Sequence, residues 1–456
     1  MVDIDATHDF ESALRELAAS LGVTGASFAY WDGMQMRSAV AGVRNSVTGD
    51  AVTIDTVMHI GSITKLMNAV LFLQLVDDGL MDLDDPVTKH VPELRLRDES
   101  ALGRITCRML INHTSGIDCD MLTDHGADQE RIVDLVARCG EVGQLHAPGE
   151  DVSYSNLATC IAGYVTQKLR GRSWYELVKE RIFKPLGLLH ALVDITEVPR
   201  FRCSVGDIWD YAEGRNIQTS RPFLPLSFAS CGTTAMMSAG DLVTFARALV
   251  PGDTSSKGTQ LLSRELSRAM TRPSAKLAAM DASWGLGWLV MPSGVLWHGG
   301  AGPGVASVLY AHEPTGRVMA LLTNCDRGGR LHAAMCEPII STWTGNPVPG
   351  RTPQASMPRD LKPYTGVFGN NLQFQQVEIG EEGLTLRSGM DHALYDRGDR
   401  LSPAVRLFPI GEHRFEMFSD LNQKGAEFLF SEPDRNGQMT KLHSGVRLFR
   451  RRTLGN

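Results

Sequence analysis

The spacing of apolar residues changes along the chain and predicts both helices and strands near its start. In residues 9–21 apolar side chains recur every three or four positions, which predicts an amphipathic helix. Two strand-like runs then flank Asp32 and Gly33, a pair of residues that favours a hairpin turn. Residues 62–78 carry a broad apolar face that ends at Gly79, so a second helix is expected there.

From about residue 284 the pattern favours strands. The runs WGLGWLV, GVLWHGG, VASVLYAHE and RVMALLTN are short and separated by turn residues, which predicts neighbouring strands of one antiparallel sheet that the early hairpin can join. A helix near 331–342 is expected to close this region. The remaining expected helices are near 131–139, 157–170, 173–183 and 240–249. The pattern therefore predicts an α/β (α+β) domain over residues 1–345, with helices flanking an antiparallel sheet.

The last quarter of the chain has a different composition. Residues 346–358 are rich in Pro, Gly and Ser, which is typical of a linker. After them the runs YTGVF, QQVEIG, GLTLRS, RFEMFS and AEFLFS recur at short intervals with turn residues between them. Residues 359–456 are therefore expected to form a small all-β module, most simply a barrel.

Composition and charge narrow the possible functions. The chain has 456 residues, too many for one core, with 43% hydrophobic residues and a formal charge of −7. No basic stripe suited to nucleic acid is present. The N-terminal residues show no secretory pattern and no run of about 18 apolar residues occurs, so we expect a cytoplasmic protein without a membrane partner.

The cysteines argue against a metal site. They lie far apart, without a Cys-x-x-Cys pair or a Cys/His cluster, so we expect reduced thiols and neither a metal nor another cofactor. They are Cys107, Cys119, Cys139, Cys160, Cys203, Cys231, Cys325 and Cys336.

The first candidate for chemistry is Ser62, at the start of the second predicted helix, with Lys65 three residues later on the same face. A serine hydroxyl becomes a useful nucleophile when a nearby base accepts its proton. A lysine is such a base when its pKa is lowered. The Ser62 N–H, unpaired at the helix start, can also bind an oxyanion. Taken alone, the same residues are better explained as an ordinary helix cap, because Ser is common at that position and Ser-x-x-Lys also occurs by chance.

The second candidate is a turn that leads into a helix and carries Tyr154 and Asn156. A tyrosine beside an ammonium can act as a general base. An asparagine can bind a substrate carbonyl through its N–H and accept a hydrogen bond from Lys65. On its own the pair is also typical of an ordinary helix N-terminus.

The third candidate is a strand that ends in His298, Gly299 and Gly300. Glycines on a strand often mark a place where another molecule approaches the backbone. The N–H of Ala301 can then serve as a second oxyanion donor, and His298 can donate to a tyrosinate or a substrate carboxylate. By itself such a histidine is more often only a strand-end residue.

These motifs, SITK, YSN and HGG in that order, resemble the serine β-lactamase and penicillin-binding-protein superfamily. The branch they resemble most is the class C β-lactamase-like group of D-peptidases, carboxypeptidases and esterases. The segments LVDDGLMDLDDPVTKHVPEL, ITCRMLINHTSGI, RIFKPLGL and SAGDLVTFARAL fit the same group. The resemblance covers about residues 10–340. Residues 359–456 resemble the lipocalin-like barrel that some members carry.

The resemblance implies a role for each matching position. Ser62 would be the acylated nucleophile, with Lys65 and Tyr154 as its bases and His298 at the third-motif position. The oxyanion hole would be the N–H groups of Ser62 and Ala301. Asn156, Gly299 and Gly300 would bind the substrate. Many β-lactamases carry Lys where this chain has His298, which lowers the expectation of antibiotic hydrolysis.

Three functions remain open. The first is hydrolysis or transfer of an acyl group from an amide or ester, on a small or peptide-like substrate that can carry D-residues. The second is release and macrocyclisation of a nonribosomal peptide, as in the penicillin-binding-protein-type thioesterases, with a carrier protein as partner. In that case Arg447 can hold a substrate carboxylate, unless it is only a solvated strand-end residue. The third is a non-catalytic, ligand-binding member of the family.

Overall fold

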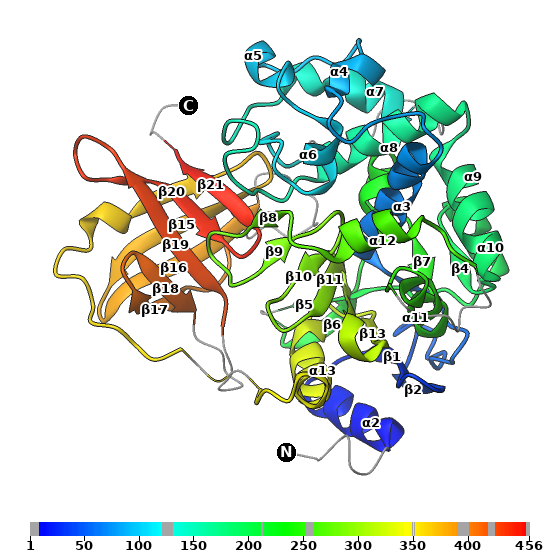
Figure 1. Ribbon diagram of the computed structural model, residues 1–456. Helices are drawn as coiled ribbons and strands as arrows, with labels where there is room; N and C mark the ends of the chain where they lie inside the picture. The colour runs from blue at the N-terminus through cyan, green and yellow to red at the C-terminus, as the bar shows by residue number, and fades with distance from the viewer. Residues whose placement is uncertain are drawn as a thin grey trace.

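The protein consists of a layered α/β region and a separate β-barrel that lie side by side (Figure 1). A computed structural model describes residues 9–120, 131–210, 213–251, 259–348, 350, 352–390, 401–417 and 425–452. We call residues 9–345 the α/β region and residues 359–452 the barrel. The α/β region has the antiparallel sheet and flanking helices that the sequence predicts.

An eight-stranded antiparallel sheet organises the α/β region. The N-terminal hairpin joins the late strands as expected, because β1 pairs with β13, for example Ala29 with Ala320. In spatial order the strands are β2 (Met36–Gly42), β1 (Gly25–Trp31), β13 (Arg317–Thr323), β12 (Val305–His312), β11 (Val295–Gly302), β10 (Leu289–Val290), β9 (Ser283–Trp284) and β8 (Ala275–Lys276).

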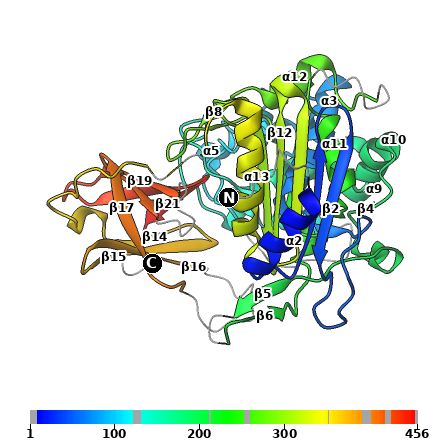
Figure 2. The same ribbon diagram turned by 90° about the horizontal axis from the view of Figure 1, so that it is seen from below.

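Helices cover both faces of this sheet (Figure 2). On one face α2 (Phe10–Ser20) and α13 (Gly328–Thr344) share a core that includes Phe28 and Met319. On the other face a larger core surrounds α3 (Thr64–Asp77). Nearly all of α3 is buried, which explains why the sequence shows a broad apolar face there. The other helices on this side include α8 (Asn156–Arg170) and α11 (Ala239–Arg247).

The smaller elements include two that the pattern did not predict. These are the helix α12 (Arg264–Thr271) and a three-stranded sheet of β3 (Met58–His59), β7 (Met236–Met237) and β4 (Ala191–Leu192). The helix predicted over 173–183 runs on to Leu186, with a π-helical turn in its middle, Lys179–Phe183. The others are α4 (Val87–His90), α5 (Glu99–Leu102), α6 (Cys107–Ile111), α7 (Arg131–Ala137), α9 (Trp174–Val178), α10 (Lys184–Leu186) and the hairpin β5 (Asp207–Asp210) with β6 (Arg215–Gln218).

The C-terminal module is a closed eight-stranded barrel, in agreement with the expected fold. Its first and last strands close it, with Phe368 opposite Arg451. Aromatic rings fill the interior, where Phe415 and Phe430 pack edge to face. The strands are β14 (Gly366–Gly369), β15 (Gln373–Gly380), β16 (Gly383–Met390), β17 (Val405–Gly411), β18 (Arg414–Met417), β19 (Glu427–Pro433), β20 (Met439–Ser444) and β21 (Arg447–Arg451).

The segment between α13 and the barrel is tied to the barrel. Thr352 donates its N–H to Glu416, and Ala355 donates its N–H to the Pro409 carbonyl. None of the helices in the described part of the chain is both long and apolar enough to cross a lipid bilayer. The eight cysteines are free thiols, and all but Cys203 are buried.

Candidate active site

Ser62 lies in a tight turn between β3 and α3. Residues Gly61–Ile63 form one 3-10 turn, and α3 follows directly. Gly61 has a φ of +52°, and a Cβ there would lie 2.7 Å from the Ala301 nitrogen. A Cβ on Gly300 would collide with the Ile60 carbonyl. Glycine at both positions therefore allows β11 to pack directly against the serine turn.

Lys65 is one turn after Ser62 and points back at it, as the spacing predicts. Its Nζ donates to Ser62 Oγ at 3.2 Å and to the Cys231 carbonyl at 2.7 Å. The side chain is 3% exposed. Burial alone lowers the pKa of Lys65, but the Tyr154 phenol and the Cys231 thiol outweigh it and raise the pKa above its usual value. Lys65 is therefore an ammonium in the resting protein, although its assignment as a base assumed a lowered pKa.

Tyr154 is held between two cations. Lys65 Nζ lies 4.6 Å from the centre of its ring, and Arg447 Cζ lies 5.1 Å from it. The ring also packs against His113 and Trp284, with centroids 4.6 and 5.8 Å away. Tyr154 is therefore packed among two cationic and two aromatic side chains.

Asn156 is the first residue of α8, which Ser155 caps by accepting the Ala158 N–H. The sequence led us to expect that Asn156 accepts a hydrogen bond from Lys65. Instead Lys65 bonds to Ser62 and Cys231, and Asn156 Oδ1 has no hydrogen-bond partner in the described part of the chain.

His298 lies on β11, buried beside Trp284 at a ring distance of 5.8 Å. Burial and the charge of Lys65 lower the pKa of His298 to about 3, so the ring is neutral. Its Nδ1 lies 2.9 Å from the Gly299 carbonyl, which only accepts, so Nδ1 must donate. Nε2 then carries the lone pair. In this arrangement Nε2 is an acceptor, not the donor that the sequence led us to expect.

The end of β11 provides an open strand edge at the site. The neighbouring strand β10 pairs with β11 only as far as Trp297, so residues 298–302 have no strand on that side within the described residues. Ala301 is exposed there, and its nitrogen lies near the serine turn. Gly299 faces the Trp297 ring.

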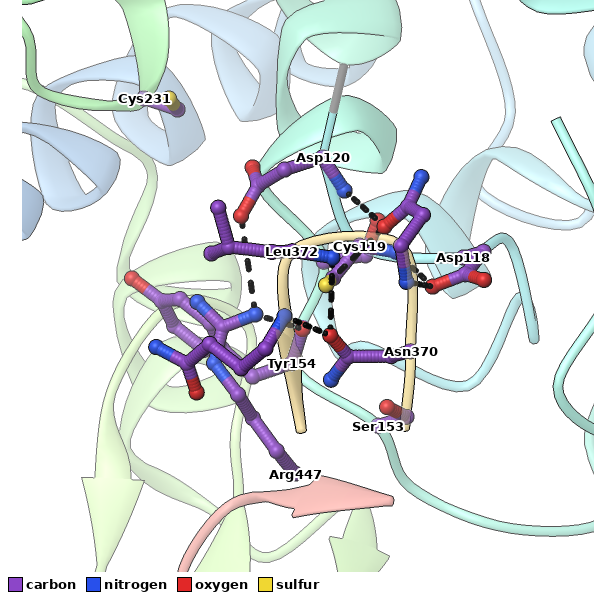
Figure 3. A network of polar contacts seen from close by, with 12 residues as sticks. Asp118, Cys119, Asp120, Ser153, Tyr154, Cys231, Asn370, Leu372 and Arg447 are labelled. Atoms are coloured by element: carbon purple, nitrogen blue, oxygen red, sulfur yellow. Dashed lines mark hydrogen bonds and ion pairs between the residues drawn. The ribbon is translucent and has the colours of Figure 1, made fainter. Parts of the chain in front are cut away.

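The barrel contributes directly to the site (Figure 3). The Val446 carbonyl accepts the Tyr154 N–H at 2.9 Å, and the Leu448 N–H donates to Ser153 Oγ at 3.2 Å. Arg447, between them, is 15% exposed and reaches over the Tyr154 ring. Its interpretation as a solvated strand-end residue is therefore wrong.

Further side chains of the site carry no signal in the sequence that we recognised. His113 accepts the Ser155 N–H through Nδ1. Burial, together with the charge of Lys65, holds its pKa well below the usual value. Asp120 is fully buried near Arg447. His113 lies in the segment ITCRMLINHTSGI, which entered the sequence analysis only as part of the family pattern, and Asp120 lies three residues beyond that segment.

These groups suit acyl transfer. A hydroxyl lies within hydrogen-bonding distance of an ammonium, and a phenol lies against that ammonium. Two backbone N–H groups, those of Ser62 and Ala301, belong to segments in close contact. Within the described residues no three His, Cys, Asp or Glu side chains gather as a metal ion would require.

Comparison with known proteins gives independent information. A family model described as beta-lactamase matches residues 10–337. Penicillin-binding protein 4 of Amycolatopsis lactamdurans is 30% identical over 355 residues, which is 76% of this chain and 93% of its own length. The structure of SurE matches 99% of both chains at 24% identity with a TM-score of 0.75. A D-stereospecific amidohydrolase from Streptomyces sp. is 28% identical, covers 72% of this chain and 98% of its own, and gives a TM-score of 0.57.

Proposed function

This chain belongs to the beta-lactamase family, whose members are serine hydrolases, and we propose that it transfers the acyl group of a peptide-like amide or ester through an acyl-enzyme on Ser62. The observation that carries the proposal is the contact of 3.2 Å between Ser62 Oγ and Lys65 Nζ, with Tyr154 packed against the same ammonium. A nucleophile, a proton acceptor and a fixed positive charge are then together in one buried site.

The first half-reaction forms the acyl-enzyme. Ser62 Oγ attacks the substrate carbonyl carbon while its proton moves to a base, and the oxyanion is bound by the N–H groups of Ser62 and Ala301. Since the pKa of Lys65 is raised, we favour the phenolate form of Tyr154 as the first acceptor: it takes the Ser62 proton and becomes a neutral phenol, while Lys65 keeps its own proton. The same proton then passes to the leaving group. Water or an amine attacks the ester in the second half-reaction.

Covalent labelling tests this proposal. A fluorophosphonate probe should label the wild type and spare Ser62→Ala, and turnover of an activated ester should disappear in the same variant. Circular dichroism and thermal unfolding of Ser62→Ala serve as the control for folding. Labelling that persists in Ser62→Ala would reject the assignment, and a wild type that binds ligand without being labelled would support the non-catalytic function.

Two similar proteins suggest the substrate class. One is a D-stereospecific amidohydrolase, and SurE has also been solved with D-Leu. We therefore propose that the acyl residue of the substrate can be a D-residue. Paired D- and L-amino-acid amides, assayed for amide release, test this; equal rates for the two enantiomers would reject it.

Peptide macrocyclisation is the second candidate, and the position of Arg447 favours it. The barrel places this cation beside Tyr154, where it can hold a carboxylate of the substrate. A carrier protein would then deliver the peptide as a thioester. Incubation with a peptidyl thioester mimic in H₂¹⁸O separates the two functions: a labelled linear acid indicates hydrolysis, and an unlabelled product that lacks one water indicates cyclisation.

A further inference from the structure

Asp120 is a buried carboxylate near Arg447 that the mechanism above does not use. Its side chain has an exposed fraction of 0%. Among the residues that the structure describes, none donates a well-formed hydrogen bond to either carboxylate oxygen. Buried ionisable groups in proteins are normally paired, so a carboxylate without donors calls for a functional explanation.

The groups around Asp120 place it in the active site. The Arg447 guanidinium lies 3.7 Å from Oδ2, and Figure 3 shows it between Asp120 and Tyr154. The Asn156 amide and the charge of Lys65 also act on the carboxyl group. Asp120 is therefore close to Arg447, Asn156 and Lys65, three of the side chains assigned to the site.

The contact with Arg447 does not satisfy this carboxylate. An arginine that pairs structurally with a carboxylate usually makes two parallel N–H···O bonds of about 2.8 Å. Here the nearest nitrogen is 3.7 Å away, and the guanidinium lies over the Tyr154 ring. Both oxygens of Asp120 thus keep most of their capacity to accept hydrogen bonds.

The position of Asp120 is fixed by the barrel. Asn371, in the turn between β14 and β15, accepts the Asp120 N–H at 2.9 Å, and its own N–H donates to Asp118 at 3.1 Å. On the other side the Cys119 carbonyl accepts the Leu157 N–H from α8. These contacts hold the backbone at Asp120 from both sides.

We propose that Asp120 is a substrate-binding residue that accepts a primary ammonium group, the α-amino group of the residue whose carbonyl Ser62 attacks. This rests on the proposed function and specifies its substrate as an aminoacyl amide or ester with a free amine. An ammonium supplies three N–H donors, which the Asp120 carboxylate lacks among the described residues, and its positive charge suits a carboxylate. The α-nitrogen is two bonds from the carbonyl carbon, so both groups fit within one small site.

The ionisation of Asp120 is in keeping with this role. Burial raises the pKa of its carboxyl group to about 6, although Arg447, Asn156 and Lys65 act in the opposite direction. The carboxylate is therefore charged at neutral pH but poorly solvated. A cationic ligand restores the interactions that burial removed.

Equilibrium binding in Ser62→Ala tests the proposal without requiring catalysis. The probes are the D-amino-acid amides of alanine, leucine and phenylalanine, each beside its N-acetyl derivative, titrated by calorimetry. Adding Asp120→Asn should weaken binding of the free amines at least 10-fold and change the N-acetyl derivatives less than 2-fold. Asp118→Asn is the matched control, because it removes a nearby buried charge while an amide oxygen can still accept the Asn371 N–H.

Three results would overturn the proposal. They are failure of Ser62→Ala to bind any free amine, an equal loss for free and acetylated probes in Asp120→Asn, and, in that variant, a gain of affinity only for the corresponding free amino acids, which carry a carboxylate. The third result would show that Asp120 only keeps Arg447 from binding a carboxylate. Fluorophosphonate labelling of the wild type reports on the proposed function separately, so the two failures are distinguishable.

Discussion

Ser62 and Lys65 lie three residues apart within one continuous element, whereas Asp120 and Arg447 come from two different parts of the molecule. The first pair lies at the start of α3, next to core residues of the α/β region such as Ile63 and Leu66, and makes a direct hydrogen bond. The second pair meets only because the barrel docks beside Tyr154. The comparison separates the proposed nucleophile and its lysine, which are positioned locally, from the proposed substrate-binding residues, whose meeting depends on the contact between two folded units.

The same contact also supports the tyrosine. Asp151, just before the YSN motif, accepts a hydrogen bond from His443 at 2.9 Å and lies 3.4 Å from Lys441, both on β20 of the barrel. Arg450 donates to the Leu145 carbonyl in the same segment. The barrel therefore contacts the segment that leads into Tyr154 at several points.

The largest effect is expected from the local pair and its phenol partner. Lys65→Ala and Tyr154→Phe should each lower kcat by about 100-fold or more, because each removes a group that handles the proton of Ser62. Steady-state kinetics on an activated ester measures the loss. Full activity of Lys65→Ala would show that reactivity does not depend on this pair.

Asp151→Asn should lower the free energy of unfolding by about 2 kcal/mol, because it leaves the nearly buried Lys441 without one of its partners. The value is below the usual cost of breaking a buried pair, since Asp151 keeps 15% exposure. Denaturant unfolding measures it. Arg406→Gln, an exposed pair with Glu382, is the control and should change stability by less than about 1 kcal/mol. A loss no larger than in the control would show that the barrel contact contributes little.

The contribution of Asp151 should also depend on pH. Burial alone would raise its pKa, but the hydrogen bond and charge of His443 and the charge of Lys441 outweigh burial and hold the pKa well below the ordinary value of 3.8. Because the pKa of Asp151 is lower in the folded protein than in the unfolded chain, its carboxylate stabilises the folded state above pH 3.8. This stabilisation is lost as pH falls toward the folded-state pKa. The stability difference between wild type and Asp151→Asn should therefore narrow below about pH 4.

Binding of a free-amine probe to Ser62→Ala should weaken as pH falls below 6, because the Asp120 carboxyl then takes up a proton. Well below pH 6 the dissociation constant of the probe should rise by about 10-fold for each pH unit. Arg447 and Lys65 stay charged over this range, and Asp118 is the other acid facing the site. Calorimetry between pH 5 and 8 measures the change, and the same slope in Asp120→Asn would assign it to another group.

The smallest effect is expected from Ser153→Ala. It removes the acceptor of the Leu448 N–H and should cost about 1 kcal/mol of stability. Since Tyr154 keeps its own bond to the Val446 carbonyl, kcat should fall only a few-fold. A loss as large as that of Tyr154→Phe would mean that the serine holds the phenol in place.

Much of the fold was accessible from the sequence because its signals are local. The helix after Ser62, the early hairpin, the late strands and the barrel all follow from apolar spacing and turn residues. Short elements such as α12 and the three-stranded sheet were missed because a few residues give little periodicity. The π turn before Pro185 was missed because a proline removes a backbone donor without specifying how the helix adjusts.

The residues of the site also differ in how far the sequence alone reveals them. Ser62, Lys65 and Tyr154 belong to motifs that can be recognised one at a time, and the structure brings the three side chains together. Asp120 lies in a loop without periodicity, and its burial is a property of the whole fold. The position of Arg447 depends on how the barrel docks, which no local pattern along a Pro- and Gly-rich connection determines.

The order of the barrel strands has a consequence for biosynthesis. β21 is made after every other described strand, and it both closes the barrel on β14 and carries Arg447. A ribosome therefore finishes the nucleophile, its lysine and the tyrosine long before it reaches the arginine. A nascent chain, or one that stops before β21, already has its reactive serine but lacks the cation beside it.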